Sequence, residues 1–106
     1  IAEGFAESAA SVLGLPVLVS DTDRFVAVSG LKQKDYINKA IDEDLDDIIQ
    51  KKSKYETNTK VVIPILSNGD PIGSVTILPP EGKVLSDLEI KNAELGAGFL
   101  AKQMAK

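Results

Sequence analysis

A hairpin followed by a capped helix, in the second half of the chain, constrains the fold more than any other feature of the sequence. Residues 61–78 form two runs rich in β-branched side chains on either side of Asn68-Gly69, and this dipeptide is the strongest short-range signal for a two-residue β-turn. Ser86 precedes Glu89 by three residues, the spacing of a capping box in which each side chain binds the other residue's free backbone amide. The sequence therefore predicts strand, tight turn, strand, loop and helix in that order.

The remaining residues predict two more helices and a second hairpin. Apolar residues at helical spacing predict a helix over residues 1–13, ended by Gly14 and Pro16. Two apolar runs, residues 16–20 and 24–28, predict a hairpin around a polar turn. One or two helical turns follow near Tyr36, and then a helix begins at Asp42. Four strands in two hairpins favour an α+β fold with an antiparallel sheet and helices on its faces; a short fifth strand near Thr57 is not part of this prediction.

The last helix, residues 86–104, is apolar on two faces. At 100° per residue, Leu88, Leu95 and Phe99 lie on one side, and the other side holds Ile90, Ala93, Ala97, Leu100 and Met104. Packing on a sheet needs only one such face, so the second favours contact with another helix. We therefore expect a homo-oligomer, a dimer or a tetramer, although the first helix of the same chain is an alternative cover. The predicted oligomer interface consists of Phe5, Leu95, Phe99, Leu100 and Met104.

Composition argues against several classes of function. The chain of 106 residues has no cysteine and no histidine, which removes disulfides and the most versatile catalytic and metal-ligating side chains. A net charge of -4 opposes binding along DNA phosphates, so we expect no DNA binding by this part alone. No apolar run is long enough to span a membrane. We expect a cytoplasmic domain that is not an enzyme, without catalytic residues, metal, cofactor or membrane contact.

Two motifs permit other interpretations. Asp21-Thr22-Asp23 after an apolar run is superficially similar to the nucleophile motif of Mg²⁺-dependent phosphatases, which makes a small hydrolase the alternative enzyme hypothesis. Its expected partners are missing from the sequence, so carboxylates that form a turn are the preferred interpretation. The acidic residues from Asp42 to Asp47 lack the spacing of a Ca²⁺ loop and are better explained as a helix start.

Several motifs resemble the closing half of the GAF family of small-molecule sensor domains. They are Ile63-Pro64-Ile65, Pro71-Ile72-Gly73-Ser74-Val75 and the segment from Ser86 to Glu89. Residues 69–73 and 96–104 are also similar to the C-terminal domains of transcription regulators that control sporulation in endospore-forming bacteria. The resemblance covers nearly the whole chain. It implies a GAF-like antiparallel sheet flanked by helices, with the terminal helices forming an oligomerisation bundle.

The resemblance also implies a regulatory role and a ligand cavity. Since Ile1 already lies on a helical pattern, we expect residues 1–106 to be one domain of a longer protein, whose small DNA-binding domain would lie N-terminal to it. In the GAF family the cavity lies between the sheet and the helices after the first hairpin, and Gly73 indicates a close backbone approach. The expected polar lining for an unknown small-molecule effector is Ser29, Tyr36, Ser74 and Thr76. A purely structural dimerisation module is the alternative.

Overall fold

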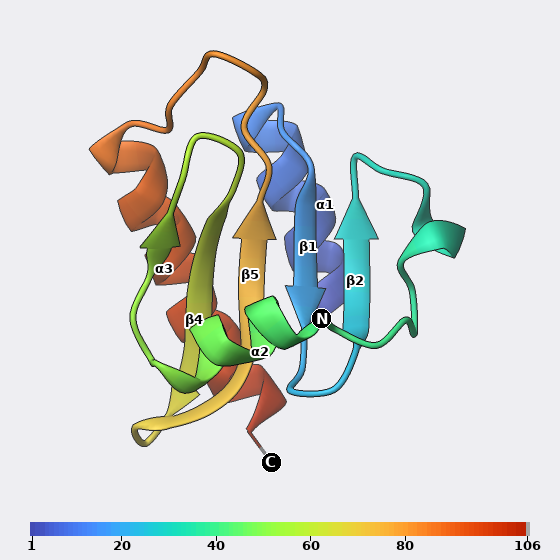
Figure 1. The fold of residues 1–106 in the computed structure, drawn as a ribbon, viewed down its shortest axis with the longest axis vertical. Coiled ribbons are helices and arrows are strands. Elements are labelled where there is room, and N and C mark those ends of the chain that lie inside the picture. The colour runs from blue at the N-terminus through green and yellow to red at the C-terminus, as the bar shows by residue number, and fades with distance from the viewer. Residues whose placement is uncertain (106) are drawn as a thin grey trace.

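A five-stranded antiparallel sheet separates two layers of helices in this computed structural model, which describes residues 1–105 (Figure 1). The strand order is β2-β1-β5-β4-β3. Helices α1 and α3 lie behind the sheet as drawn in Figure 1, and α2 crosses its front. The elements are α1 (Ala2–Leu13), β1 (Val17–Ser20), β2 (Phe25–Ser29), the 3-10 helix η1 (Gln33–Asp35), α2 (Glu43–Gln50), β3 (Tyr55–Glu56), β4 (Val61–Ser67), β5 (Asp70–Ile77) and α3 (Asp87–Met104).

The predicted α+β arrangement is confirmed, but the sheet has one strand more than predicted. Strand β3 contains only Tyr55 and Glu56, which pair with Val62 and Val61 of β4. Both β3 residues are exposed, so no alternation between polar and apolar side chains marks them as a strand. The fifth strand is therefore formed by pairing with β4 and has no sequence pattern of its own.

The local signals at the hairpin and at the last helix are confirmed in detail. Asn68 has a φ of 51° and Gly69 a φ of 83°, the left-handed pair that a two-residue hairpin turn of type I′ requires. At the start of α3, the Glu89 amide donates to Ser86 Oγ at 3.1 Å, and the Ser86 amide donates to Glu89 Oε1 at 2.8 Å. These two bonds form the capping box and start the helix at Asp87.

Two apolar clusters of unequal size hold the helices on the sheet. The larger cluster joins alternate residues of β1, β4 and β5, among them Val19, Ile63 and Val75, to buried residues of α1 and α3. The smaller cluster consists of Leu45, Ile48 and Ile49 of α2 with Val62 of β4, and it is flanked by Phe25 and Ile41. Because successive strand residues point to opposite faces, each layer of helices contacts a different set of sheet residues.

The capping box predicts a pH dependence of stability. The Glu89 carboxyl accepts a hydrogen bond from the Ser86 amide and interacts with the Ser86 side chain. Together with the nearby positive charge of Lys83, these contacts hold the pKa of the carboxyl below its ordinary value of 4.5. A lowered pKa in the folded state contributes stability that is present above pH 4.5 and lost as the pH falls through the folded value. The free energy of unfolding of wild type should exceed that of Glu89→Gln at pH 7, and the gap should shrink toward pH 3.

Urea unfolding at a series of pH values measures this gap. Glu7→Gln removes a carboxylate from an exposed position of α1 and serves as the control for the loss of one charge. A gap between wild type and Glu89→Gln that stays constant from pH 7 to pH 3 would contradict the role of the ionised carboxylate.

Candidate functional site

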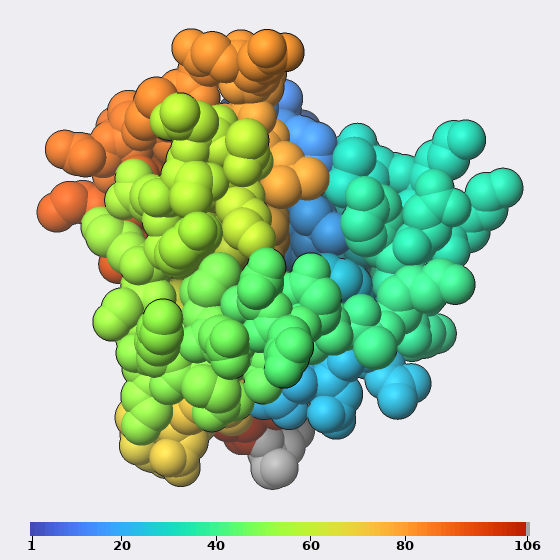
Figure 2. All heavy atoms as spheres, viewed as in Figure 1, coloured from blue at the N-terminus to red at the C-terminus, as the bar shows by residue number. Residues whose placement is uncertain are grey.

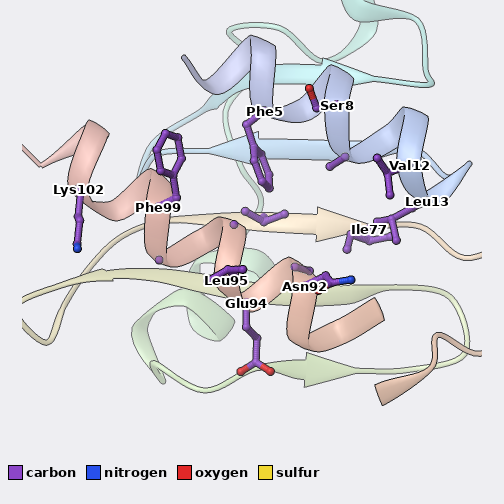
Figure 3. A pocket seen from close by; sticks show the side chains of 15 residues that line it. Phe5, Ser8, Val12, Leu13, Ile77, Asn92, Glu94, Leu95, Phe99 and Lys102 are labelled. Carbon is purple, nitrogen blue, oxygen red and sulfur yellow. The ribbon is translucent and has the colours of Figure 1, made fainter. Parts of the chain in front are cut away.

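An open hollow of about 940 Å³ lies between α1 and α3 on the outer side of the sheet (Figure 3). Its deepest residues are Val75 and Ile77 of β5, which are almost fully buried. Phe5 reaches it from α1 and Phe99 from α3 (Figure 3). Polar side chains are few, and they are Ser8, Asn92, Glu94 and Lys102. The hollow is therefore an apolar surface with a charged margin, open to the outside.

Most of the large hydrophobic side chains that the described residues expose belong to these two helices. Eight such residues are exposed, and five of them lie on α1, at its N-cap or on α3, while Tyr55, Leu66 and Val84 lie elsewhere. The five are Ile1, Val12, Leu88, Leu95 and Phe99, with exposed fractions from 54% for Phe99 to 83% for Val12. Of the five, Val12, Leu95 and Phe99 line the hollow, and exposed hydrophobic residues gathered on one surface are typical of interaction sites.

Helix α3 has the two apolar faces that the sequence predicts. The prediction that Leu100 belongs to the interface is wrong. Leu100 has no exposed surface and packs in the larger core cluster, so it is not available to another chain. Phe5 and Met104 are half-buried against the same cluster, and Leu95 and Phe99 face outward. The alternative that α1 covers the outer face of α3 does not hold for Leu88, Leu95 and Phe99, because all three remain exposed.

A row of buried hydroxyl groups lies on the opposite face of the sheet, beneath α2. Ser20 of β1 and Ser74 of β5 are fully buried, and their Oγ atoms are 2.6 Å apart. Each hydroxyl carries one proton, so their mutual bond leaves one of the two protons without an acceptor. Thr76 follows on the same face of β5, and its buried Oγ1 has no hydrogen-bond partner among residues 1–105. The chain thus buries polar groups that it does not fully satisfy, which is costly unless something else binds them.

The structure brings together only part of the predicted ligand lining. Ser74 and Thr76 lie on the α2 face, and Tyr36 approaches that side through an edge-to-face contact of its ring with Phe25 at 6.1 Å between centroids. Ser29 pairs with Val17, whose side chain belongs to the cluster on the other face, so its register separates it from the hydroxyl row. In Figure 2 the green atoms of α2 and the yellow-green atoms of the segment after it cover much of this face, and the teal segment after β2 lies along its right edge. Sequence reasoning missed Ser20, although its place at the end of an apolar run was visible.

Two smaller predictions are resolved by local contacts. The close approach expected at Gly73 is made by β1, because a Cβ on Gly73 would collide with the carbonyl oxygen of Ser20. Asp21 acts as a turn residue, since its Oδ1 accepts from the amides of Asp23 at 2.7 Å and Arg24 at 2.8 Å.

Within residues 1–105, no group of three or more acidic residues is arranged to hold a metal ion, and no helix is long and apolar enough to cross a membrane.

Comparison with known sequences identifies the family. Residues 1–105 match the family described as stage V sporulation protein T C-terminal, transcription factor. The chain belongs to this family. It is 36% identical over 119 residues to stage V sporulation protein T of Bacillus subtilis (strain 168), and the alignment covers 97% of this chain. The chain spans 66% of the length of that relative. The predicted resemblance to sporulation regulators is therefore confirmed, and membership of a transcription factor family confirms the expectation that the domain is not an enzyme.

Solved structures confirm that this member of the stage V sporulation protein T C-terminal family has a GAF-like fold. The GAF domain of an Acinetobacter phosphoenolpyruvate-protein phosphotransferase has a TM-score of 0.87 at 9% sequence identity. The match covers 98% of this chain and 80% of the Acinetobacter chain. The second GAF domain of DevS from Mycobacterium smegmatis has a TM-score of 0.81 at 15% sequence identity, and the match covers 98% of this chain and 91% of the DevS chain. The cofactor-binding GAF domain of the nutrient sensor CodY from Clostridium difficile has a TM-score of 0.78 at 15% sequence identity, and the match covers 96% of this chain and 83% of the CodY chain. At these identities the likeness shows the fold alone.

The hydroxyl row predicts opposite effects for two substitutions. Thr76→Val replaces a buried hydroxyl that has no partner with a methyl group of the same shape, and should raise the free energy of unfolding by about 1–2 kcal/mol. Ser74→Ala removes one member of a hydrogen-bonded pair and leaves the Ser20 hydroxyl buried alone, which should lower it by about 1–3 kcal/mol. Urea unfolding measures both changes. Destabilisation by Thr76→Val would show that the Thr76 hydroxyl has a partner in solution.

Proposed function

We propose that this domain is the regulatory part of a bacterial sporulation transcription regulator, that it self-associates through α1 and α3, and that it binds a small molecule beneath α2. The observation that carries the proposal is the exposed apolar surface shared by α1 and α3. Leu95 is 75% exposed and Phe99 is 54% exposed, and both line the hollow between the helices. In a monomer these exposed apolar side chains would remain in contact with water and would add nothing to the stability of the fold.

Burial of this surface would contribute favourably to association. Moving one Leu or Phe side chain from water to an apolar contact contributes about 1.5–3 kcal/mol. A symmetric dimer buries each residue twice, and aromatic residues are enriched among those that dominate binding energy. The charged margin, with Glu94 and Lys102 around an apolar centre, has the distribution typical of protein interfaces.

The ligand part of the proposal rests on the row formed by Ser20, Ser74 and Thr76. The three hydroxyls are buried, and the bond between Ser20 and Ser74 uses only one of their three protons, so a carbonyl or carboxylate oxygen is the complementary chemistry. The likeness to a cofactor-binding GAF domain of a nutrient sensor supports a small-molecule effector on the same fold. The effector would enter between the sheet and α2, where the smaller cluster holds the helix.

Any effect of this domain on DNA binding would be indirect. The net charge of -4 disfavours contact with phosphates, so the DNA-binding part is proposed to lie in the region of the longer relatives that this chain does not cover. Self-association would set the number and spacing of those DNA-binding units, which raises their effective concentration at adjacent sites. Such a protein would act in the cytoplasm. The hydrolase hypothesis finds no support, because Asp21 is engaged by backbone amides.

Substitutions on the outer face of α3 test self-association. The double variant Leu95→Glu/Phe99→Glu should be monomeric at concentrations where wild type is a dimer or tetramer, because burying unpaired charges costs several kcal/mol. Light scattering over a wide concentration range measures the mass. Val84→Glu, at a residue that is 69% exposed but lies outside both helices, should associate as wild type does. A monomeric wild type across the range would refute the proposal. Leu100→Glu is unsuitable because it places a charge in the core.

A ligand screen separates a sensor from a purely structural module. We expect a carboxylate-containing small molecule, from a panel of amino acids, organic acids and nucleotides, to raise the melting temperature of the domain, since a ligand that binds only the folded state stabilises it. Ser74→Ala should abolish that shift. No shift with any compound of the panel would favour the structural module, and a shift unchanged in Ser74→Ala would place the ligand elsewhere.

A further inference from the structure

One asparagine of this chain, at the tip of the β4–β5 hairpin, differs from the others in the residue that follows it. The asparagines are Asn38, Asn58, Asn68 and Asn92, all of them exposed, and only Asn68 precedes a glycine. The side-chain amide of an asparagine can be attacked by the backbone nitrogen of the next residue, and glycine hinders this attack least because it has no side chain. At Gly69 the position of a Cβ has nothing within 4 Å.

Hydrogen bonding also separates Asn68 from the other asparagines. The amides that follow two of them are engaged, since Lys39 donates to the Tyr36 carbonyl at 2.9 Å and Thr59 donates to Thr57 Oγ1 at 3.2 Å. The amide that follows the asparagine of α3 lies inside the helix, where amides donate to the preceding turn. Within residues 1–105 the Gly69 amide donates to no backbone carbonyl. Its nitrogen can therefore react without first losing a hydrogen bond.

We propose that Asn68 is a site of spontaneous covalent modification, at which the side-chain amide is lost and the backbone of the turn is rearranged. The Gly69 nitrogen bonds to Cγ of Asn68, the bond from Cγ to Nδ2 breaks, and the Gly69 amide proton leaves with Nδ2 as ammonia. The product is a five-membered succinimide ring. Water, the only co-reactant, then cleaves the bond from the ring nitrogen to either carbonyl carbon. Cleavage at Cγ gives aspartate, and cleavage at the backbone carbonyl gives isoaspartate.

The reaction occurs in the folded domain when the turn opens. The succinimide ring fixes the rotation about the Cα–C bond of Asn68, so ring closure requires the type I′ turn to relax. Turns at the tips of hairpins open at a free energy far below that of global unfolding. Asn68, Gly69 and Asp70 are all exposed, and their opening uncovers no core residue. The modification is thus slow, but it does not need the domain to unfold.

Isoaspartate loosens the β4–β5 hairpin because its backbone runs through the former side chain. One extra backbone carbon enters a connection of only two residues, whose type I′ geometry depends on two consecutive positive φ values. Ser67 and Asp70 pair directly across this turn, and a longer connection disturbs their pairing. The register of β5 on β4 loses its fixed point, although every core side chain remains in the chain.

Peptide mapping by mass spectrometry tests the modification. After incubation of the folded domain at neutral pH, the fragment with Asn68 should gain about 1 Da, the difference between water added and ammonia lost, and backbone fragmentation should identify isoaspartate. Conversion should be at least about tenfold faster than at the three other asparagines, which are internal controls in the same sample. Asn68→Gly retains a residue pair suited to a type I′ turn and should show no such gain. Conversion of Asn68 no faster than that of the other asparagines would overturn the proposal.

Urea unfolding tests the effect on the hairpin. The unfolding midpoint of wild type should fall as isoaspartate accumulates, whereas Asn68→Gly incubated for the same time should keep its midpoint. Freshly prepared Asn68→Asp carries the charge of the product without the extra backbone carbon, and it should unfold close to fresh wild type. An unchanged midpoint in converted wild type would overturn the loosening of the hairpin. A fall no larger than that of Asn68→Asp would assign the effect to charge and would overturn it as well.

Discussion

The pairing of β5 with both of its neighbours is the constraint on which the rest of this structure depends. Strand β5 lies between β1 and β4, with Val75 opposite both Val19 and Ile63. Its alternate residues face different layers: Ser74 and Thr76 lie beneath α2, and Val75 and Ile77 form the floor of the hollow between α1 and α3. A slip of one residue would exchange these two sets. The turn at Asn68-Gly69 prevents it by fixing the register of β5 on β4.

Features determined by neighbouring residues were predictable from the sequence. The hairpin turn and the capping box depend on residues at most three positions apart, and both have the expected geometry. The two apolar faces of α3 were also predictable from helical spacing. Which face meets the sheet was not, because the pattern contains no information about the neighbouring layer. Helical spacing therefore separates Leu95 and Phe99, which are exposed, from Leu100, but it does not predict that Leu100 lies in the core.

The hydroxyl row illustrates what local patterns omit. Ser20 and Ser74 are 54 residues apart in sequence, and they meet only because β1 and β5 are adjacent in the sheet. The strand order places the first hairpin beside the last strand, and no short motif specifies that order. Ser29 was grouped with Ser74 from the family resemblance alone, whereas the strand register puts it on the other face. Strand order and register are thus the information that a prediction of individual elements lacks.

The unequal size of the two apolar clusters fits the division of the proposed function. Helices α1 and α3 are anchored by a cluster that runs through β1, β4 and β5, so the surface proposed for association rests on the larger part of the core. Helix α2 is held by three of its own residues and Val62, with flanking contacts from Phe25 and Ile41. An element with fewer apolar contacts separates from a domain at a lower free energy than its core does. The side proposed to admit a small molecule is therefore the side expected to open at the lower cost, and the side proposed for assembly belongs to the larger cluster, which excludes α2.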